Sequence, residues 1–250
     1  MSAGSLARPL AFLALEGQRA FAEWLSYFGT SRLLERAPRG DGHPVLVLPG
    51  FLAADDSTGI LRRYLKRLGY ASHPWLLGRN LGAPHFVRER LVDRAAELYA
   101  RYQRKISIVG WSLGGIYARE LAKLLPNRVR QVISLGSPFG DVARPTALAR
   151  LFEFASGRDL ASEMPERVER IRAAPPVPST AIYSKSDGVT HWRVCREDEG
   201  PGRDNIEVTG SHCGLGWNPL VLWAIADRLS QKEDEWRPFE PDGWLGYLYR

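Results

Sequence analysis

The stretch KISIVGWSLGGIYARELAKLL, residues Lys105 to Leu125, joins a β-branched apolar run to a helical pattern through a glycine-rich turn. Ile106, Ile108 and Val109 are typical of a buried strand. Beyond the turn, apolar residues recur at helical spacing, at Ile116, Tyr117, Leu121, Leu124 and Leu125. Ser112 therefore lies on the turn itself, between a predicted strand and a predicted helix.

The residues around this serine fit the pattern G-x-S-x-G, as Gly110-Trp111-Ser112-Leu113-Gly114. With a strand before it and a helix after it, the pattern predicts a strained turn that lifts a nucleophilic serine clear of the sheet. The helix N-terminus favours negative charge, so the Leu113 N–H is predicted as one donor of an oxyanion hole. The second predicted donor is the Phe51 N–H, in the loop LPGFLA after an earlier strand.

A serine hydroxyl needs a base to take its proton and an acid to orient that base. His212, in VTGSHCGLG after the last predicted strand, is predicted as the base, with the glycines leaving room for a mobile imidazole. Asp187, at the end of TAIYSKSD, is favoured as the acid, and Asp141 is the alternative. The competing histidines lie in early loops or too close to Asp187: His43, His73, His85 and His191.

Composition limits the classes of protein. A chain of 250 residues with 44% hydrophobic residues can bury a full core in one domain. The net charge is +6, but the basic residues are spread among acids on predicted helix faces. No aromatic-basic recognition motif accompanies them, so no nucleic-acid partner is expected. No segment is apolar enough to span a bilayer, and LAFLAL has no small-residue cleavage site after it, which favours a cytoplasmic location.

Strands that alternate with helices predict an α/β fold with a central, mostly parallel sheet and helices on both faces. Residues 43–138 and 179–230 are predicted as its core, and 139–178 as a helical cap or lid. Residues 1–42 are predicted to form a helical extension whose amphipathic helix docks on the domain or, alternatively, contacts a membrane surface. The aromatic tail, 231–250, is expected to pack on its own domain or on another subunit. The sequence therefore allows an oligomer as well as a monomer.

Ser112, Asp187 and His212, in that chain order, occur together with LPGF, GWSLGG, LGSPF, YSKSDGVTHW and GSHCGLGWNP. These residues resemble the α/β-hydrolases of the lipase and carboxylesterase kind. The resemblance implies acyl-enzyme chemistry without a cofactor. A single PGF in place of HGGG resembles enzymes that act on medium or long acyl chains. Trp111, Leu52 and Phe152 are predicted to line the acyl pocket, with a place in the core as the alternative.

The resulting hypothesis is a serine hydrolase that cleaves carboxylic esters of small molecules or lipids. A thioesterase, a lactonase or an acyltransferase would use the same residues, and a catalytically silent lipid-binding or interaction module is the alternative from another class. Cys195 and Cys213 are the only cysteines, and the sequence leaves open whether they form a disulfide or stay reduced. Two cysteines supply too few ligands for a metal site, so none is predicted.

Overall fold

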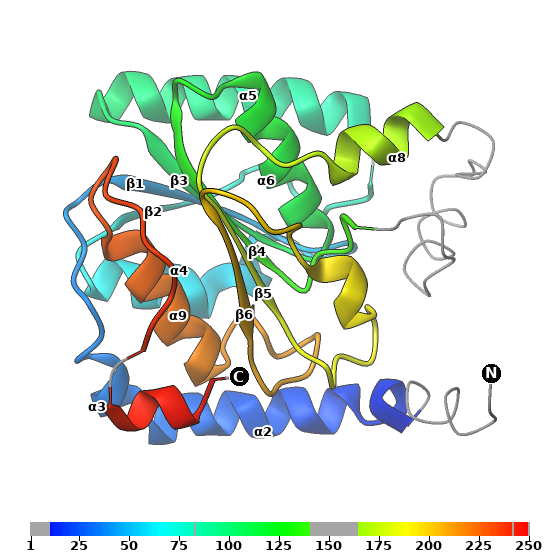
Figure 1. Cartoon of the computed structure of the whole chain (residues 1–250), viewed down its shortest axis with the longest axis vertical. Coiled ribbons are helices and arrows are strands. Elements are labelled where there is room, and N and C mark those ends of the chain that lie inside the picture. Colours follow the sequence, from blue (N-terminus) through cyan, green and yellow to red (C-terminus); the bar gives the residue numbers. More distant parts are fainter. Residues whose placement is uncertain (1–10, 83, 141–164, 242, 250) are drawn as a thin grey trace.

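A six-stranded parallel sheet forms the centre of the protein in a computed structural model that describes residues 11–82, 84–140, 165–241 and 243–249 (Figure 1). The strand order is β2-β1-β3-β4-β5-β6, and every neighbouring pair is parallel. The strands are β1 (Pro44–Leu48), β2 (Ala71–Pro74), β3 (Ile106–Trp111), β4 (Val129–Leu135), β5 (Ser179–Tyr183) and β6 (Arg203–Glu207). The predicted α/β class with a central parallel sheet is confirmed.

The inner strands are apolar because both faces of the sheet are covered. β1, β3, β4 and β5 are buried along their whole length. Alternate residues of β1 serve different cores: Val45 and Val47 pack on one side, and Leu46 and Leu48 on the other. Pro74 is tolerated because β2 lies at the sheet edge, where a missing N–H is less costly.

Helices cover both faces of this sheet (Figure 1). One face carries α5 (Pro84–Tyr102) and α6 (Leu113–Leu124), with α8 (Pro165–Arg172) beside α6. The other face carries α4 (Gly59–Arg67) and α9 (Pro219–Ser230). Short elements complete the described chain: α3 (Ser31–Leu34), η1 (Asp55–Thr58), η2 (Trp192–Cys195) and η3 (Gly243–Tyr247). Most of the predicted lid, residues 141–164, lies outside the described residues.

The N-terminal helix α2 (Glu16–Gly29) runs along the side of the molecule that α9 covers (Figure 1). The C-terminal segment packs on the same chain: the Tyr249 hydroxyl donates a hydrogen bond to the Leu220 carbonyl over 2.7 Å, and its ring contacts Phe239. Within the described ranges, no helix has the length and apolar character needed to cross a membrane.

Candidate active site

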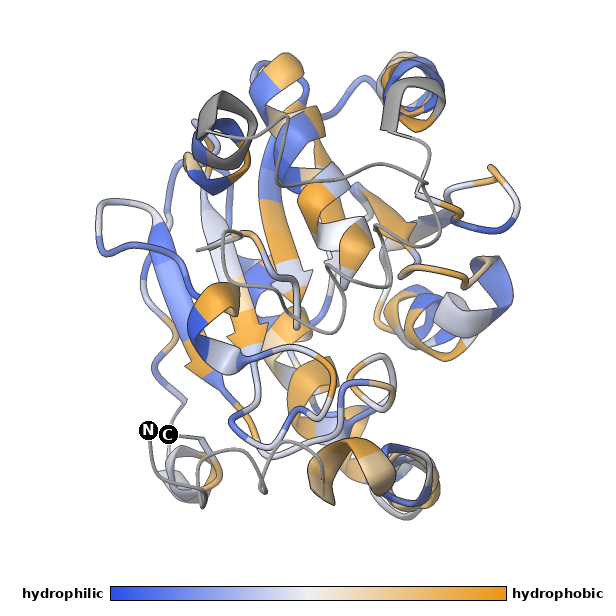
Figure 2. Cartoon of the chain, turned by 90° about the vertical axis from the view of Figure 1, so that its right-hand side faces the viewer, coloured by the Kyte–Doolittle hydropathy of each residue, from blue (hydrophilic) through white to orange (hydrophobic). Residues whose placement is uncertain are grey.

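Ser112 lies between the last residue of β3 and the first residue of α6, at the carboxyl edge of the sheet. Figure 2 shows that the central strands of this sheet are mostly hydrophobic. Its backbone has φ 53° and ψ −120°, in a region that residues with a side chain rarely adopt. The turn is held by the sheet, because the Ser112 N–H donates to the Leu135 carbonyl over 2.8 Å. The first amides of α6, including that of Leu113, have no acceptor within the helix. The serine side chain is thus fixed beside a helix N-terminus.

Two glycines make this turn sterically feasible. A Cβ on Gly110 would lie 2.5 Å from the Gly114 carbonyl carbon, and a Cβ on Gly114 would lie 2.5 Å from the Leu48 carbonyl oxygen. These are backbone atoms that cannot move aside cheaply. Any larger residue at either position would push α6 away from β1 and β3, and the turn at Ser112 would change with it.

The loop after β1 lies beside the serine. A Cβ on Gly50 would be 3.3 Å from the Ser112 Cβ, so the two segments are in van der Waals reach. The buried Asn80 holds this loop: its side-chain amide donates to the Pro49 carbonyl over 3.0 Å. Its backbone carbonyl accepts from the Leu52 N–H over 2.7 Å, and its own N–H donates to the Ala53 carbonyl over 2.8 Å. The loop that carries Phe51 is therefore anchored on both sides.

Asp187 and His212 meet at the same edge, from the loops after β5 and β6. Asp187 Oδ2 lies 2.7 Å from His212 Nδ1, and both side chains are buried. The other Asp187 oxygen accepts from the backbone amides of Val189 and Thr190, over 2.8 and 2.7 Å. The Thr190 hydroxyl donates to Asp187 Oδ2 over 2.9 Å. Three contacts thus orient the carboxylate toward the imidazole.

The charges around His212 favour its protonated form. Burial acts to lower the pKa of the imidazole, but the charge of Asp187, the hydrogen bond to it and the nearby Glu16 carboxylate together raise it above its usual value. An imidazole with a raised pKa holds a proton more readily once it has taken one. In the described part of the chain, the Ser112 hydroxyl makes no hydrogen bond with this imidazole. The two residues are linked through Trp111, whose indole N–H donates to the His212 carbonyl over 3.1 Å.

The predicted pocket residues take different positions. Leu52 lies on the surface with φ 59°, in the loop beside Ser112. Trp111 is buried in the core, in an edge-to-face contact with Trp217, because the end of β3 turns this side chain toward the core that α9 shares. It supports the histidine loop. Phe152 and the alternative acid Asp141 lie outside the described residues.

Charged residues of α2, which the sequence analysis did not identify, hold both loops. Glu16 is buried, and its Oε1 accepts from the backbone amides of Gly188 and His212 over 2.8 and 3.1 Å. Its Oε2 accepts from the Cys213 amide over 3.0 Å. Arg19 donates to the carbonyls of Ser186 and Gly210 over 2.6 and 2.8 Å.

Glu23 completes this set of contacts. It accepts from the Ser211 amide over 2.6 Å and from the side-chain amide of Asn218 over 3.2 Å. One helix therefore ties the acid loop to the base loop. The signal in the sequence was the placement of Glu16, Arg19 and Glu23 on one helical face, opposite Phe21, Trp24, Leu25 and Phe28.

The glycines near Asp187 and His212 allow the N-terminal segment and Trp111 to approach closely. A Cβ on Gly188 would lie 2.5 Å from the Phe12 carbonyl carbon, and a Cβ on Gly214 would lie 2.6 Å from the Glu23 carboxyl carbon. A Cβ on Gly216 would lie 2.6 Å from the Trp111 ring. The prediction that the glycines of VTGSHCGLG leave space for a mobile imidazole is wrong, because Glu23 fills the space at Gly214 and Trp111 fills the space at Gly216.

The two cysteines are free thiols. Cys195 is buried, with Sγ 3.6 Å from the Thr190 hydroxyl, whereas Cys213 is exposed next to His212. The disulfide alternative is therefore not realised. Although Cys213 is exposed as a residue, the partial burial of its thiol and the neighbouring Glu16 carboxylate raise the pKa of that thiol to about 11. Among the described residues, no group of three or more potential ligands is placed to hold a metal ion.

The other histidines occupy different environments. His43 Nδ1 lies 2.5 Å from Asp41 Oδ1, and His43 Nε2 lies 2.8 Å from the Ser107 hydroxyl, deep at the amino end of the sheet. His73 contacts the Tyr102 hydroxyl over 2.9 Å, and His191 is exposed. Neither His43 nor His73 lies on the loops that follow the strand ends near Ser112.

Solved structures match this chain in fold at low sequence identity. Lipase B of Aspergillus fumigatus superposes with a TM-score of 0.57 at 18% identity, over 78% of this chain and 54% of its own length. The monoacylglycerol lipase of Paleococcus ferrophilus superposes with a TM-score of 0.53 at 15% identity, over 76% of this chain and 96% of its own length. Mouse alpha/beta hydrolase domain-containing protein 10 superposes with a TM-score of 0.51 at 17% identity, over 77% of this chain and 91% of its own length.

This chain thus spans about half the length of the Aspergillus lipase. No protein-family model and no curated relative matches the sequence. The strand order, the strained turn at Ser112 and these structural matches together define the class: the chain has the α/β-hydrolase fold.

Proposed function

We propose that this protein is a serine hydrolase that cleaves carboxylic esters through an acyl-enzyme. The observation that carries the proposal is a strained serine at a helix N-terminus with a hydrogen-bonded aspartate and histidine pair at the same sheet edge. A strained residue persists only when the surrounding structure holds it, and such residues concentrate at functional sites.

In the proposed reaction, Ser112 Oγ attacks the acyl carbonyl carbon while His212 Nε2 takes the hydroxyl proton. The carbonyl π electrons move onto the oxygen, and the resulting oxyanion is stabilised by the N–H groups of Phe51 and Leu113. When the C–O bond breaks, His212 returns the proton to the leaving alcohol. Water then attacks the acyl-enzyme by the same route and releases the acid. The Ser112–His212 hydrogen bond would form as substrate binds, because such contacts are often long in the free enzyme.

The surface next to Ser112 supports an apolar acyl group. Leu52, Leu76 and Leu81 are about half exposed or more, on two loops that the Leu52–Asn80 hydrogen bond joins. Leu52 and Leu76 both have positive φ, at 59° and 62°, so the backbone is strained where it presents these side chains. Two of the structural neighbours are named as lipases, which agrees with a substrate that carries a medium or long acyl chain.

Two measurements test this function. A fluorophosphonate probe should label the wild-type protein and leave Ser112→Ala unlabelled, while Ser107→Ala, a matched change on the same strand, stays labelled. Hydrolysis of p-nitrophenyl esters should favour medium or longer acyl chains over acetate, and Ser112→Ala should lose roughly 10⁴-fold or more in kcat.

A folded wild-type protein that resists the probe would support the silent binding module. Full activity in Ser112→Ala would remove Ser112 from the mechanism. If the protein hydrolyses acyl thioesters or lactones far faster than p-nitrophenyl esters, the same residues would carry out the reaction of a thioesterase or a lactonase.

A further inference from the structure

The helix α2 is amphipathic in the opposite sense to an ordinary surface helix, which turns its apolar face to the core. Its charged residues, Glu16, Arg19 and Glu23, all point into the protein and bind the loops described above. Large apolar residues of α2, and two leucines just before it, point outward. We define the apolar stripe as Leu13, Leu15, Phe21, Trp24, Leu25 and Phe28, each of them exposed.

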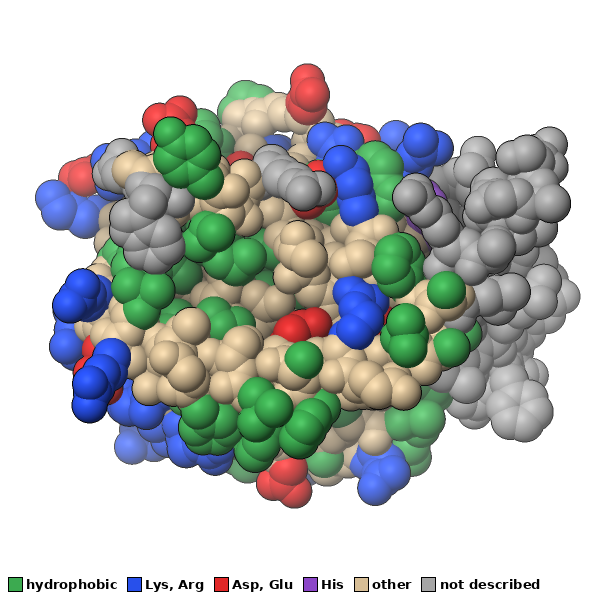
Figure 3. Space-filling view, turned by 90° about the horizontal axis from the view of Figure 1, so that it is seen from below, with side chains coloured by type: hydrophobic (Ala, Val, Ile, Leu, Met, Phe, Trp, Pro, Cys, Tyr) green, Lys and Arg blue, Asp and Glu red, His purple; other side chains and the backbone are tan. Residues whose placement is uncertain are grey.

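The aromatic part of the apolar stripe is continuous. Phe21 is 59% exposed and Phe28 is 54% exposed, and Trp24 lies between them with ring centroids 5.7 and 4.8 Å away. None of the exposed residues between 11 and 29 is charged. Figure 3 views the molecule from the side of α2, and hydrophobic side chains gather on this face. An exposed apolar patch of this kind marks a contact surface.

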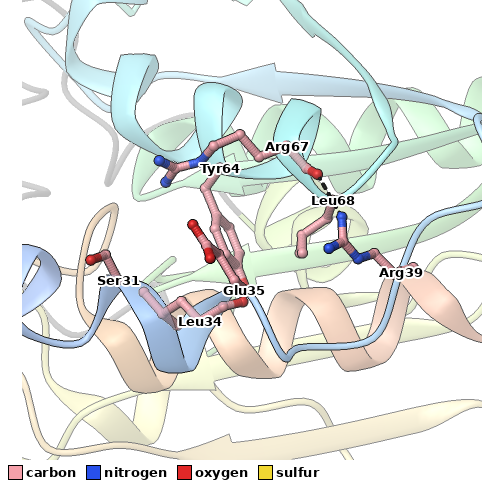
Figure 4. Close-up of a pocket in the computed structure, with 7 residues that line it drawn as sticks. All are labelled: Ser31, Leu34, Glu35, Arg39, Tyr64, Arg67 and Leu68. Atoms are coloured by element: carbon pink, nitrogen blue, oxygen red, sulfur yellow. Dashed lines mark hydrogen bonds between the residues drawn. The ribbon is translucent and has the colours of Figure 1, made fainter.

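Basic residues flank one end of the stripe. We define the basic rim as the exposed side chains of Arg32, Arg36, Arg39, Lys66 and Arg67, among which Glu35 is the exposed acid. The rim adjoins α2 directly, because the Arg67 guanidinium donates to the Tyr27 hydroxyl over 2.5 Å. Arg39 and Arg67 also line a pocket of about 150 Å³ between α3 and α4 (Figure 4).

We propose that the apolar stripe and the basic rim dock this protein on an anionic lipid surface. An amphipathic helix with aromatic residues inserts its apolar side at the boundary of headgroups and acyl chains, and arginines attract anionic headgroups. Trp24 fits this boundary because tryptophan favours membrane interfaces. A second copy of this chain fits less well, because it would bring a basic rim of the same sign toward the first.

The docking surface lies close to the loops that carry Asp187 and His212. The side of α2 opposite the stripe binds the backbone of Gly188 and His212 through Glu16. Docking would therefore place the loops of Asp187 and His212 within one helix diameter of the lipid. This consequence rests on the proposed hydrolase function, whereas the lipid binding does not, so the two can fail separately.

Vesicle sedimentation of the full chain tests the binding. Vesicles of phosphatidylcholine with phosphatidylglycerol should retain the wild-type protein, and pure phosphatidylcholine should retain less of it. The triple variant Phe21→Ser, Trp24→Ser, Phe28→Ser should lose at least about tenfold in partitioning, because three large apolar side chains no longer leave water. Leu124→Ser, a similar change at an exposed leucine of α6, should bind as the wild type does. Thermal unfolding checks that each variant is folded.

Lipids brominated on their acyl chains give a second, local readout. They should quench part of the tryptophan fluorescence of the wild type, and Trp24→Phe should lose that quenching while still binding vesicles. The proposal is overturned if the wild type ignores anionic vesicles, if the triple variant binds unchanged, or if gel filtration shows a dimer that the triple variant dissociates.

Discussion

A serine, a histidine and an aspartate meet at each end of strand β3. At the carboxyl end, Ser112 follows the strand, and Asp187 is bonded to His212. At the amino end, Ser107 lies within the strand, and His43 is bonded both to Ser107 and to Asp41. The second group is the more completely hydrogen-bonded of the two, yet the first is the one that we propose to be reactive.

The difference lies in the backbone and in the surrounding charges. Ser107 lies within a strand, pairs with β1 and β4 and is fully buried, whereas Ser112 is strained and stands at the N-terminus of α6. Burial lowers the pKa of His43 to about 4, against the raising effect of Asp41 and with help from Arg130. His212 has its pKa raised. A hydrogen-bonded trio is therefore not by itself a catalytic site; the turn and the electrostatics decide.

The largest expected contrast is between the two histidines. His212→Gln should lower kcat for p-nitrophenyl esters by about 10⁴-fold, because no group then takes the serine proton. His43→Gln should leave kcat nearly unchanged and lower the free energy of unfolding by about 1 to 3 kcal/mol, because it disturbs a buried hydrogen-bond pair. Steady-state kinetics and urea denaturation measure the two effects. Equal losses of kcat would break the distinction between the two groups.

The helix α2 supports only the carboxyl-end group. Glu16→Ala would leave the amides of Gly188, His212 and Cys213 without their acceptor, so kcat should fall by about 10- to 100-fold through misplacement of the base. Glu16→Gln retains an acceptor oxygen and should recover part of the loss. Glu97→Gln, which removes a surface carboxylate paired with Arg94, is the matched control and should leave kcat unchanged.

The Glu16→Gln variant should also change the pH profile of the activity. Only the neutral imidazole accepts a proton, so activity should rise with pH through a His212 pKa above about 6.5. Glu16 helps to raise this pKa, and Glu16→Gln should therefore move the acid limb of kcat/KM to lower pH. A loss of activity with an unmoved acid limb would show that Glu16 acts only on the structure.

The loop beside Ser112 offers a smaller test. Asn80→Ser removes the hydrogen bond to the Pro49 carbonyl and should lower kcat by about tenfold with little change in KM, because the Phe51 amide would be less well placed. Asn205→Ser, which loses comparable contacts with Glu197 on the far edge of the sheet, should alter stability but not kcat. Similar kcat values for both variants would show that Asn80 does not help to position the Phe51 amide.

The smallest effect concerns stability and has opposite signs for the two histidines. The folded pKa of His43 lies below its unfolded value, so its contribution is full above pH 6.5 and is lost as the pH falls toward 4. The folded pKa of His212 lies above its unfolded value, so its contribution is full below pH 6.5 and is lost as the pH rises through the folded pKa. Urea denaturation of wild type and each glutamine variant at several pH values should show a difference in the free energy of unfolding that grows with pH for His43→Gln and shrinks with pH for His212→Gln. Parallel curves for the two variants would contradict this assignment.

The sequence by itself was sufficient to predict the parallel α/β fold and the strand-turn-helix around Ser112. That turn depends on residues within a few positions of one another, and Gly110 and Gly114 are the small residues that its backbone contacts require. The pairing of Asp187 with His212 was predictable as well, because each follows a strand and parallel strands bring their carboxyl ends to one edge. Their catalytic roles stay predictions.

Only the tertiary structure decided which partners came from distant parts of the chain. Glu16 reaches a loop almost two hundred positions away, and no local pattern encodes that contact. Three further features depend on which elements pack against each other. They are the side toward which Trp111 turns, the contacts that fill the space at Gly188 and Gly214, and the face of α2 that is exposed. Local spacing specifies an element and its two faces, but which face is buried is settled by the neighbour that packs on it.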